Sequence, residues 1–152
     1  MKPQDYLDFA RLYAEKNSGC RKVAVGSVLV KHGNMISFGA NREFSRQCKE
    51  KGCHRVLVYG DDSKAHRNPE DCLAIHSEVD AIAKSATFLH GCSLYVTRYP
   101  CEGCAKAIIS AGIQAVYYGG TAEASDMTKH MFWEAGIDLI HVKNWSEDNT
   151  DR

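Results

Sequence analysis

The spacing of apolar positions changes along the chain, and each change predicts a different element. Near the start, apolar residues recur at every third or fourth position, which predicts an amphipathic helix over residues 4–16. The valine-rich stretch 23–30 predicts a strand. A turn at 31–34 and a second apolar stretch at 35–39 then complete a β-hairpin. The chain is therefore predicted to begin with a helix followed by a hairpin.

From Ala74 onward, segments with helical spacing alternate with short strand-like segments. In chain order these are helix 76–86, strand 93–97, helix 101–111, strand 114–118, helix 127–135 and strand 137–142. Alternation of helix and strand is typical of a sheet that has parallel strands and helices packed on it. The chain shows no internal repeat, so residues 1–152 are predicted to form one α/β domain.

The stretch between these two parts, about 41–72, is polar and lacks clear periodicity. It contains three of the seven cysteines. We interpret it as a long loop or insertion, because loops of this length are usually functional or held by specific contacts.

Composition narrows the class of protein. Apolar residues make up 44% of the chain and charged residues 25%, which is ordinary for a globular domain. No apolar run approaches the roughly 20 residues that cross a bilayer, and the first residues lack a secretory pattern, so a cytoplasmic location is expected. The 19 basic and 19 acidic side chains balance, which favours a small ligand over a polynucleotide. An odd number of cysteines in a reducing compartment favours metal binding or catalysis.

Two short motifs carry candidate chemistry. The first is His76-Ser77-Glu78 at the start of a predicted helix, and the second is Pro100-Cys101-Glu102-Gly103-Cys104, where a strand leads into another helix. Cysteines three positions apart face the same side of a helix, and the helix N-terminus favours their thiolate forms. Three ligands, His76, Cys101 and Cys104, leave a fourth tetrahedral position open, as in catalytic zinc sites.

Glu78 lies two positions from a predicted ligand, close enough to move protons without binding the metal itself. An H-x-E motif followed by P-C-x-x-C is the signature of zinc deaminases, so Glu78 is the predicted catalytic residue. Taken alone, the C-x-x-C could instead be a redox pair. A structural zinc ribbon would need a second C-x-x-C, which the sequence lacks.

The chain resembles the deoxycytidylate (dCMP) deaminase family, and in particular its short viral members. The resemblance runs from VAVGSVLVKHGNMISFGAN through CLAIHSEVDAI to SLYVTRYPCEGCAKAIISAGI and QAVYY. It implies the three-layer cytidine-deaminase fold, with a five-stranded mixed sheet flanked by helices. It also implies a homo-oligomer, usually a hexamer, that holds one catalytic zinc ion per chain.

The implied reaction is dCMP plus water giving dUMP and ammonia, a step toward thymidylate. By this resemblance Glu78 takes a proton from zinc-bound water and passes it to N3 of the ring, while hydroxide attacks C4. Asn41 matches the family asparagine that contacts the deoxyribose. Arg21 and Lys22, just before the first predicted strand, are candidates for the 5′-phosphate, and surface charge is the alternative interpretation of both.

Three departures from the family pattern affect what the resemblance implies. The usual His-Ala-Glu has Ser77 in its centre here, a residue small enough to fit. The family's G-Y-N-G turn reads Gly39-Ala40-Asn41-Arg42, which bears on dCTP and dTTP as allosteric effectors because regulated members bind triphosphates there. The segment 119–122 lacks a tyrosine that members often place near the phosphate.

Some viral members hold a second, structural zinc ion, and several residues here occupy matching places. These are Cys20, His66, either Cys48 or Cys53, and Cys72, the last displaced because Ala74 stands at the family's fourth position. A second zinc would help to order the long polar segment. The alternative is that these cysteines are free or buried.

Other functions share the two motifs. A tRNA adenosine deaminase would need a basic groove, which this neutral chain does not show. A deaminase of free cytidine or deoxycytidine needs the same metal without the phosphate contacts. A non-catalytic zinc-binding module is the remaining alternative, although it would have no use for Glu78.

Overall fold

The computed structural model describes residues 1–20, 23–44, 46–59 and 72–147. The strands there are β1 (Gly26–Lys31), β2 (Asn34–Ala40), β3 (Arg42–Glu43), β4 (Ala74–Ile75), β5 (Ser93–Val96), β6 (Ala115–Tyr118) and β7 (Asp138–His141). The helices there are α1 (Pro3–Asn17), α2 (Gln47–Glu50), α3 (His54–Tyr59), α5 (Ser77–Lys84), α6 (Glu102–Ala111) and α7 (Asp126–Ala135).

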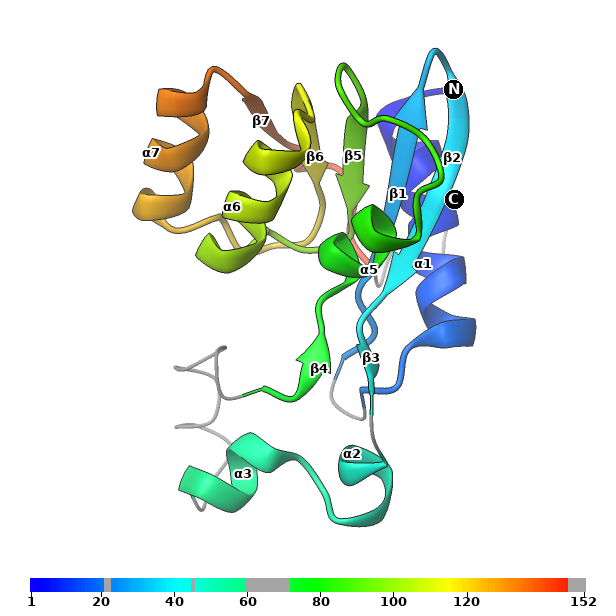
Figure 1. The fold of residues 1–152 in the computed structure, drawn as a ribbon, viewed down its shortest axis with the longest axis vertical. Coiled ribbons are helices and arrows are strands. Elements are labelled where there is room, and N and C mark those ends of the chain that lie inside the picture. The colour runs from blue at the N-terminus through cyan, green and yellow to red at the C-terminus, as the bar shows by residue number, and fades with distance from the viewer. Residues whose placement is uncertain (21–22, 45, 60–71, 148–152) are drawn as a thin grey trace.

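Five strands form one mixed sheet in the order β2-β1-β5-β6-β7 (Figure 1). β1 is antiparallel to β2, which follows it through a tight turn, and it is also antiparallel to β5 on its other side. β5, β6 and β7 run parallel, with a helix in each connection. The predicted five-stranded mixed sheet flanked by helices is therefore confirmed.

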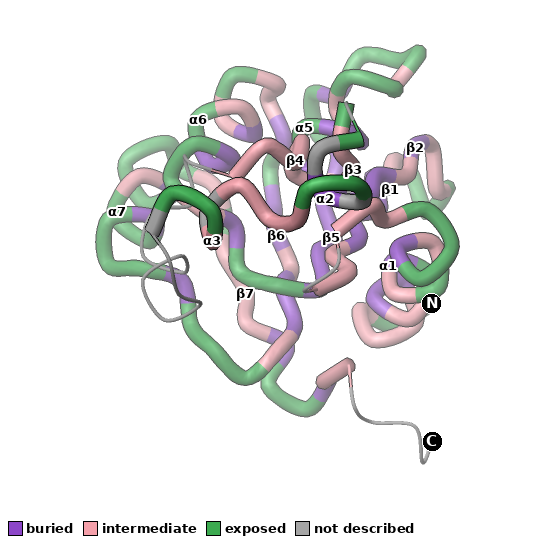
Figure 2. Tube along the Cα trace, turned by 90° about the horizontal axis from the view of Figure 1, so that it is seen from below, coloured by how far each residue is buried: buried purple, intermediate pink, exposed green. Residues whose placement is uncertain are grey.

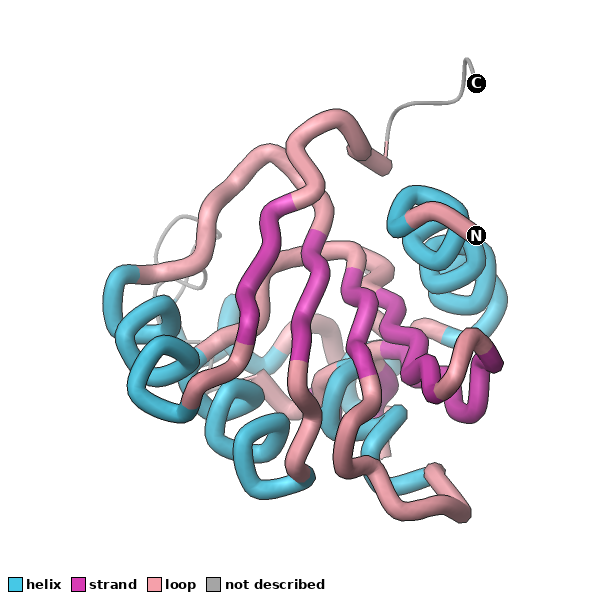
Figure 3. The backbone as a smooth tube through the Cα atoms, turned by 90° about the horizontal axis from the view of Figure 1, so that it is seen from above, coloured by secondary structure: helices cyan, strands magenta, loops and turns pink. Residues whose placement is uncertain are grey.

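The helices cover both faces of the sheet and make three layers. α1 lies on one face, and α5, α6 and α7 lie on the other (Figure 3). Side chains alternate between the two faces of a strand. Val28 on β1 therefore packs in a cluster with Leu7 of α1, whereas its neighbour Leu29 packs in the cluster that contains Ile108 of α6.

Burial follows this layered arrangement. The central strands β1, β5 and β6 are mostly buried, whereas the edge strand β7 is only half-buried (Figure 2). Large side chains such as Trp145 and Phe132 close the two clusters and are almost fully buried. No helix among the described residues is both long and apolar enough to cross a membrane.

Helix α5 lies unusually close to the sheet. A Cβ atom on Gly39 of β2 would lie 2.0 Å from the carbonyl oxygen of Ser77, so only glycine permits this approach. The contact brings the first turn of α5 against the hairpin, and this turn carries the predicted catalytic motif.

The structure differs from the sequence-based elements in two places. β1 begins at Gly26 rather than at residue 23, because the N–H of Val25 and the C=O of Val23 bind the side chain of Asn41. The predicted loop 41–72 contains β3, α2 and α3, and β3 pairs with β4. Helices of four and six residues are too short to produce a recognisable periodicity.

Candidate metal centre

Two helix N-termini meet beside the sheet and bring the motif residues together. His76 is the N-cap of α5 and directly follows β4. Cys101 is the N-cap of α6, and Cys104 lies in the first turn of that helix. β5 leads into α6 through 97–100, so the cluster lies beyond the carboxyl end of a parallel strand, where α/β folds commonly bind ligands.

The three predicted ligands form a compact cluster. Their donor atoms all lie within 4.8 Å of one another. Nδ1 of His76 is 3.3 Å from Sγ of Cys104 and 3.5 Å from Sγ of Cys101. Tetrahedral zinc with ordinary Zn–N and Zn–S bonds would separate such atoms by about 3.6 Å. The donor set and its spacing therefore fit a zinc ion.

The electrostatics of the cluster also suit a cation. A hydrogen bond from the Cys104 thiol, assisted by His76, lowers the pKa of Cys101 to about 3 despite partial burial. The same hydrogen bond, together with burial, raises the pKa of Cys104. One sulfur of the pair is therefore a thiolate at neutral pH, which is the form that binds metals.

Glu78 lies beside this cluster in the first turn of α5. Its residue is 3% exposed, and burial raises the pKa of its carboxyl above the ordinary value. The Cys104 thiol and the Ser77 hydroxyl both hydrogen bond to its carboxylate. A buried carboxyl with a raised pKa is suited to accept and return a proton near neutral pH.

The cluster opens into a cavity of about 640 Å³, a size within the usual range for small-molecule pockets. His76 and both cysteines line it, with Tyr99 at one side and Thr128 of α7 at another. A smaller cavity of about 130 Å³, which Arg98 and the segment 119–122 line, shares Tyr99 with the first. The arrangement can hold a small polar ligand against a bound metal.

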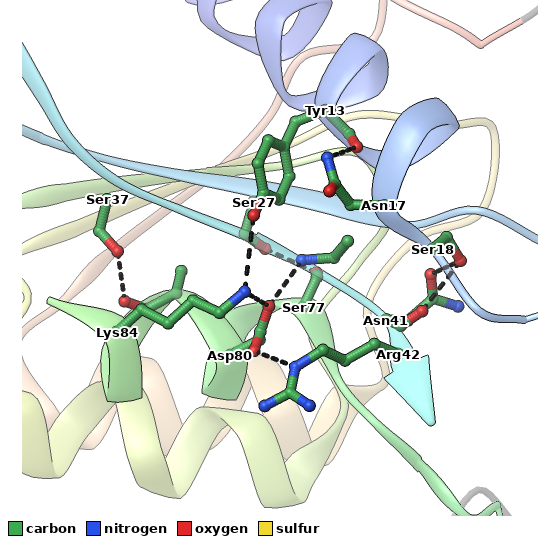
Figure 4. A network of polar contacts seen from close by, with 12 residues as sticks. Tyr13, Asn17, Ser18, Ser27, Ser37, Asn41, Arg42, Ser77, Asp80 and Lys84 are labelled. Carbon is green, nitrogen blue, oxygen red and sulfur yellow. Dashed lines mark hydrogen bonds and ion pairs between the residues drawn. The ribbon is translucent and has the colours of Figure 1, made fainter. Parts of the chain in front are cut away.

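A buried ion network fixes α5 in place (Figure 4). Asp80 is 1% exposed and accepts hydrogen bonds from Nε of Arg42 at 2.7 Å, Nζ of Lys84 at 2.9 Å and the N–H of Ala40 at 3.1 Å. Burial alone would raise the pKa of Asp80, but the Arg42 and Lys84 hydrogen bonds outweigh it and lower the pKa below its ordinary value. The network joins α5 to the end of β2.

Of the three predicted substrate-binding residues, only Asn41 lies among the described residues. Asn41 is buried, and its side chain accepts from the N–H of Val25 and donates to the C=O of Val23. It also bonds to Ser18, so it holds the segment that leads into β1. Arg21, Lys22 and His66 lie outside the described residues.

The four described cysteines of the predicted second site gather near β3 and β4. The backbone N–H of Cys48 donates to Glu43 of β3 at 2.7 Å. Burial, and then nearby charge on Glu43, Cys53 and Cys72, raise the pKa of Cys48. Gly19, the residue before Cys20, also lies next to Glu43, because a Cβ atom on Gly19 would be 3.2 Å from Cγ of Glu43. Within the described part of the chain, however, only the His76, Cys101 and Cys104 set has three ligand atoms this close together.

Sequence reasoning missed several residues at the centre, including Ser27, Asp80 and Tyr99. Ser27 is fully buried in β1, and its Oγ lies 2.6 Å from Oγ of Ser77. A serine inside the apolar stretch 23–30 was an available signal, because a buried hydroxyl needs a partner. Its partner is 50 positions away, however, and no pattern in the sequence identifies it.

Comparison with known proteins places these features in a family context. The family model described as the cytidine and deoxycytidylate deaminase zinc-binding region matches residues 1–120 of this chain. The ComE operon protein 2 of Bacillus subtilis is 32% identical over 131 residues, which cover 83% of this chain and 64% of that protein. The chain therefore spans less than two thirds of that relative.

Two phage proteins match over nearly their whole length. The deoxycytidylate deaminase of Enterobacteria phage T4 is 27% identical, with 98% of this chain and 97% of the phage protein covered. The crystal structure of dCMP deaminase from the cyanophage S-TIM5, in complex with dCMP and dUMP, is 27% identical and superimposes with a TM-score of 0.67. That match covers 93% of this chain and 98% of the cyanophage chain.

Proposed function

Because the chain belongs to the zinc-binding family of cytidine and deoxycytidylate deaminases, we propose that it is a hydrolase that converts dCMP and water into dUMP and ammonia. The observation that carries the proposal is the His76, Cys101 and Cys104 cluster, with the buried Glu78 beside it, at a cavity of nucleotide size. Similarity to phage dCMP deaminases over nearly their full length supports dCMP as the substrate.

In this proposal His76, Cys101 and Cys104 hold one catalytic zinc ion. Zinc held there lowers the pKa of water and so supplies a hydroxide nucleophile at neutral pH. Glu78 takes the proton that the attacking water gives up and delivers it to N3 of the ring. As the bond from C4 to the exocyclic nitrogen breaks, Glu78 passes the remaining hydroxyl proton to that nitrogen, which leaves as ammonia. The burial of Glu78 directly beside the predicted ligands supports this role.

The contacts to the sugar and phosphate are a further part of the proposal. We assign Asn41 to the deoxyribose, and Arg21 and Lys22 to the 5′-phosphate. Arg98 is an additional cation, because it lines the small cavity that shares Tyr99 with the metal pocket. If these cations bind phosphate, Arg21→Ala or Arg98→Ala raises the KM for dCMP but leaves the KM for deoxycytidine unchanged.

We also propose a second, structural zinc ion held by Cys20, His66, Cys72 and either Cys48 or Cys53. The convergence of Cys48, Cys53 and Cys72 near β3 and β4 supports this site. Metal analysis of the purified protein is expected to give two zinc ions per chain. A single zinc ion, lost in a Cys104→Ser variant, would show that the second group is metal-free.

The proposal includes a homo-oligomer, with a hexamer expected, in the cytoplasm. Exposed apolar residues on α7, among them Trp133 and Met127, offer surface that a second copy can cover. Seven free cysteines suit a reducing compartment.

The proposal also includes dCTP and dTTP as effectors at the turn 39–42, where Arg42 keeps 42% of its side chain exposed. Titration of dCMP turnover with dCTP and dTTP tests the effectors, and light scattering tests the oligomer.

The substrate is tested by ammonia release from dCMP, CMP, deoxycytidine and a tRNA anticodon stem-loop. Turnover of dCMP well above that of the others supports the proposal. Equal turnover of dCMP and deoxycytidine would refute the phosphate contacts and favour a nucleoside deaminase. Turnover of the stem-loop alone would identify a tRNA adenosine deaminase. Zinc binding without turnover of any of them would favour a non-catalytic module.

A further inference from the structure

A chain of buried hydroxyl groups leads from the sheet to Glu78. Ser27 of β1 and Ser77, the first residue of α5, are both fully buried. Their Oγ atoms lie 2.6 Å apart, and Oγ of Ser77 donates to Oε2 of Glu78 at 3.3 Å. Figure 4 shows Ser27 and Ser77 close to the Asp80 network that fixes the same helix.

The direction of donation follows from counting hydrogens. Each hydroxyl has one hydrogen, and an ionised carboxylate can only accept. If Ser77 donates to Glu78, its oxygen is free to accept the hydrogen of Ser27, and both hydrogens are used. In the reverse arrangement, Ser77 would donate to Ser27, and the hydrogen of Ser27 would have no acceptor among the hydrogen bonds of the described residues. Buried donors without acceptors are costly, so the first arrangement is favoured.

We propose that Ser77 and Ser27 are positioning residues that orient the Glu78 carboxylate for proton transfer. The Ser77 hydroxyl binds Oε2 and restricts rotation of the carboxylate, and Ser27 fixes the Ser77 hydroxyl in its donating orientation. The Cys104 thiol also hydrogen bonds to this carboxylate, so the Ser77 hydroxyl is one of the groups that hold it. This inference rests on the proposed function, because it assigns Glu78 the proton-transfer role.

A matched control exists on the neighbouring strand. Ser37 of β2 is also buried, and its hydroxyl donates to the backbone oxygen of Ala81 in α5 at 2.7 Å. Ser37→Ala therefore removes a buried hydrogen bond between the sheet and the same helix without touching Glu78. A purely structural role for Ser77 would give Ser77→Ala and Ser37→Ala the same effects.

The first test measures kcat, KM and zinc content of the zinc-loaded wild type, Ser77→Ala, Ser27→Ala, the double variant and Ser37→Ala. We expect kcat of Ser77→Ala to fall about 3- to 10-fold, the size of one hydrogen bond, with KM and zinc content unchanged. Ser27→Ala lowers kcat in the wild-type background but has no further effect when Ser77 is already alanine. Ser37→Ala loses stability and keeps its kcat. An unchanged kcat in Ser77→Ala, or an equal fall in Ser37→Ala, overturns the inference.

A second test does not depend on turnover. In crystal structures of the zinc-loaded proteins, we expect one orientation of the Glu78 carboxylate in the wild type and in Ser37→Ala. In Ser77→Ala the carboxylate is expected to rotate or to occupy more than one orientation. A single wild-type orientation in Ser77→Ala overturns the inference whatever the substrate proves to be. Absence of turnover by the wild type, in contrast, refutes the proposed function and leaves this second result to decide the positioning role.

Discussion

Asp80 offers a quantitative test of how α5 is held, because its three hydrogen-bond donors differ in exposure. Oδ1 accepts from Arg42, and Oδ2 accepts from Lys84 and from the backbone N–H of Ala40. The side chains of Arg42 and Lys84 are 42% and 44% exposed, so water can replace their bonds. The residue Ala40 is 1% exposed, so its N–H has no such alternative.

The expected losses of folding free energy follow from this difference. In Asp80→Asn the amide oxygen can still accept from Ala40. The amide NH2 group then takes the place of Oδ1 and cannot accept from Arg42, so the Arg42 hydrogen bond is lost and the Lys84 ion pair weakens, which predicts a loss of about 1–2 kcal/mol. Asp80→Ala also leaves the buried N–H unpaired, at a cost of about 1–3 kcal/mol, so its total loss is about 2–5 kcal/mol. For a domain of this size, each kcal/mol lowers the Tm by about 2–4 °C.

The assay is urea unfolding of the zinc-loaded protein, with Glu15→Ala as the control. Glu15 pairs with Arg11 on the surface of α1, so its removal is expected to cost less than about 0.5 kcal/mol. The order Asp80→Ala, then Asp80→Asn, then Glu15→Ala is the central expectation. Equal stability of Asp80→Ala and Glu15→Ala would refute the reasoning.

The pH dependence of the Asp80 effect provides a second check. Hydrogen bonds lower the pKa of Asp80 in the folded protein, so its ionised form stabilises the fold above the unfolded pKa of about 3.9. This stabilisation is lost as the pH falls through the folded pKa. The difference in stability between wild type and Asp80→Asn is therefore expected to stay constant from about pH 5 to 8 and to shrink below about pH 4. A difference that grew on acidification would contradict the assignment.

Three further predictions concern the metal cluster and the packing around it. Cys104→Ser is expected to reduce zinc affinity at least 10-fold, measured by competition with a chelator, and unchanged affinity would exclude this residue as a ligand. Gly39→Ala places a Cβ 2.0 Å from the carbonyl oxygen of Ser77 and is expected to cost about 1–3 kcal/mol in urea unfolding; a neutral effect would mean that α5 lies farther from β2. Phe132→Ala is expected to lower the free energy of unfolding by about 3–5 kcal/mol, because the side chain is fully buried. Trp133 is exposed, so Trp133→Ala, measured on the monomer, is expected to change it by less than about 0.5 kcal/mol. Similar losses in the two variants would contradict the orientation of α7.

Local patterns in the sequence were sufficient for the main elements and for the metal cluster. The N-terminal helix and the six alternating elements after Ala74 appear within a few residues of their predicted bounds, because each has its own apolar periodicity. The predicted ligands His76, Cys101 and Cys104 do come together. His76 and Cys101 both cap the N-terminus of a helix, so the correct order of the strands is enough to bring their motifs together.

Features that depend on distant pairing were not predictable. The Ser27 and Ser77 contact joins residues 50 positions apart, and it depends on the close approach of α5 to the sheet that Gly39 permits. Asp80 looked like an ordinary polar residue of an amphipathic helix, yet the fold places Arg42 beside it and buries it. The pairing of β3 with β4 likewise involves two residues on each strand, too few to leave a pattern.

The most direct test of the proposed catalytic centre is a parallel measurement of zinc content and dCMP turnover in the wild type and in Glu78→Gln. The glutamine has nearly the same shape as Glu78 but cannot take up or return a proton. We expect equal zinc content in the two proteins, with dUMP and ammonia formed by the wild type and a rate about 100- to 10,000-fold lower in Glu78→Gln. Turnover of dCMP by Glu78→Gln at the wild-type rate would contradict the assignment of this carboxylate as the proton-transfer group.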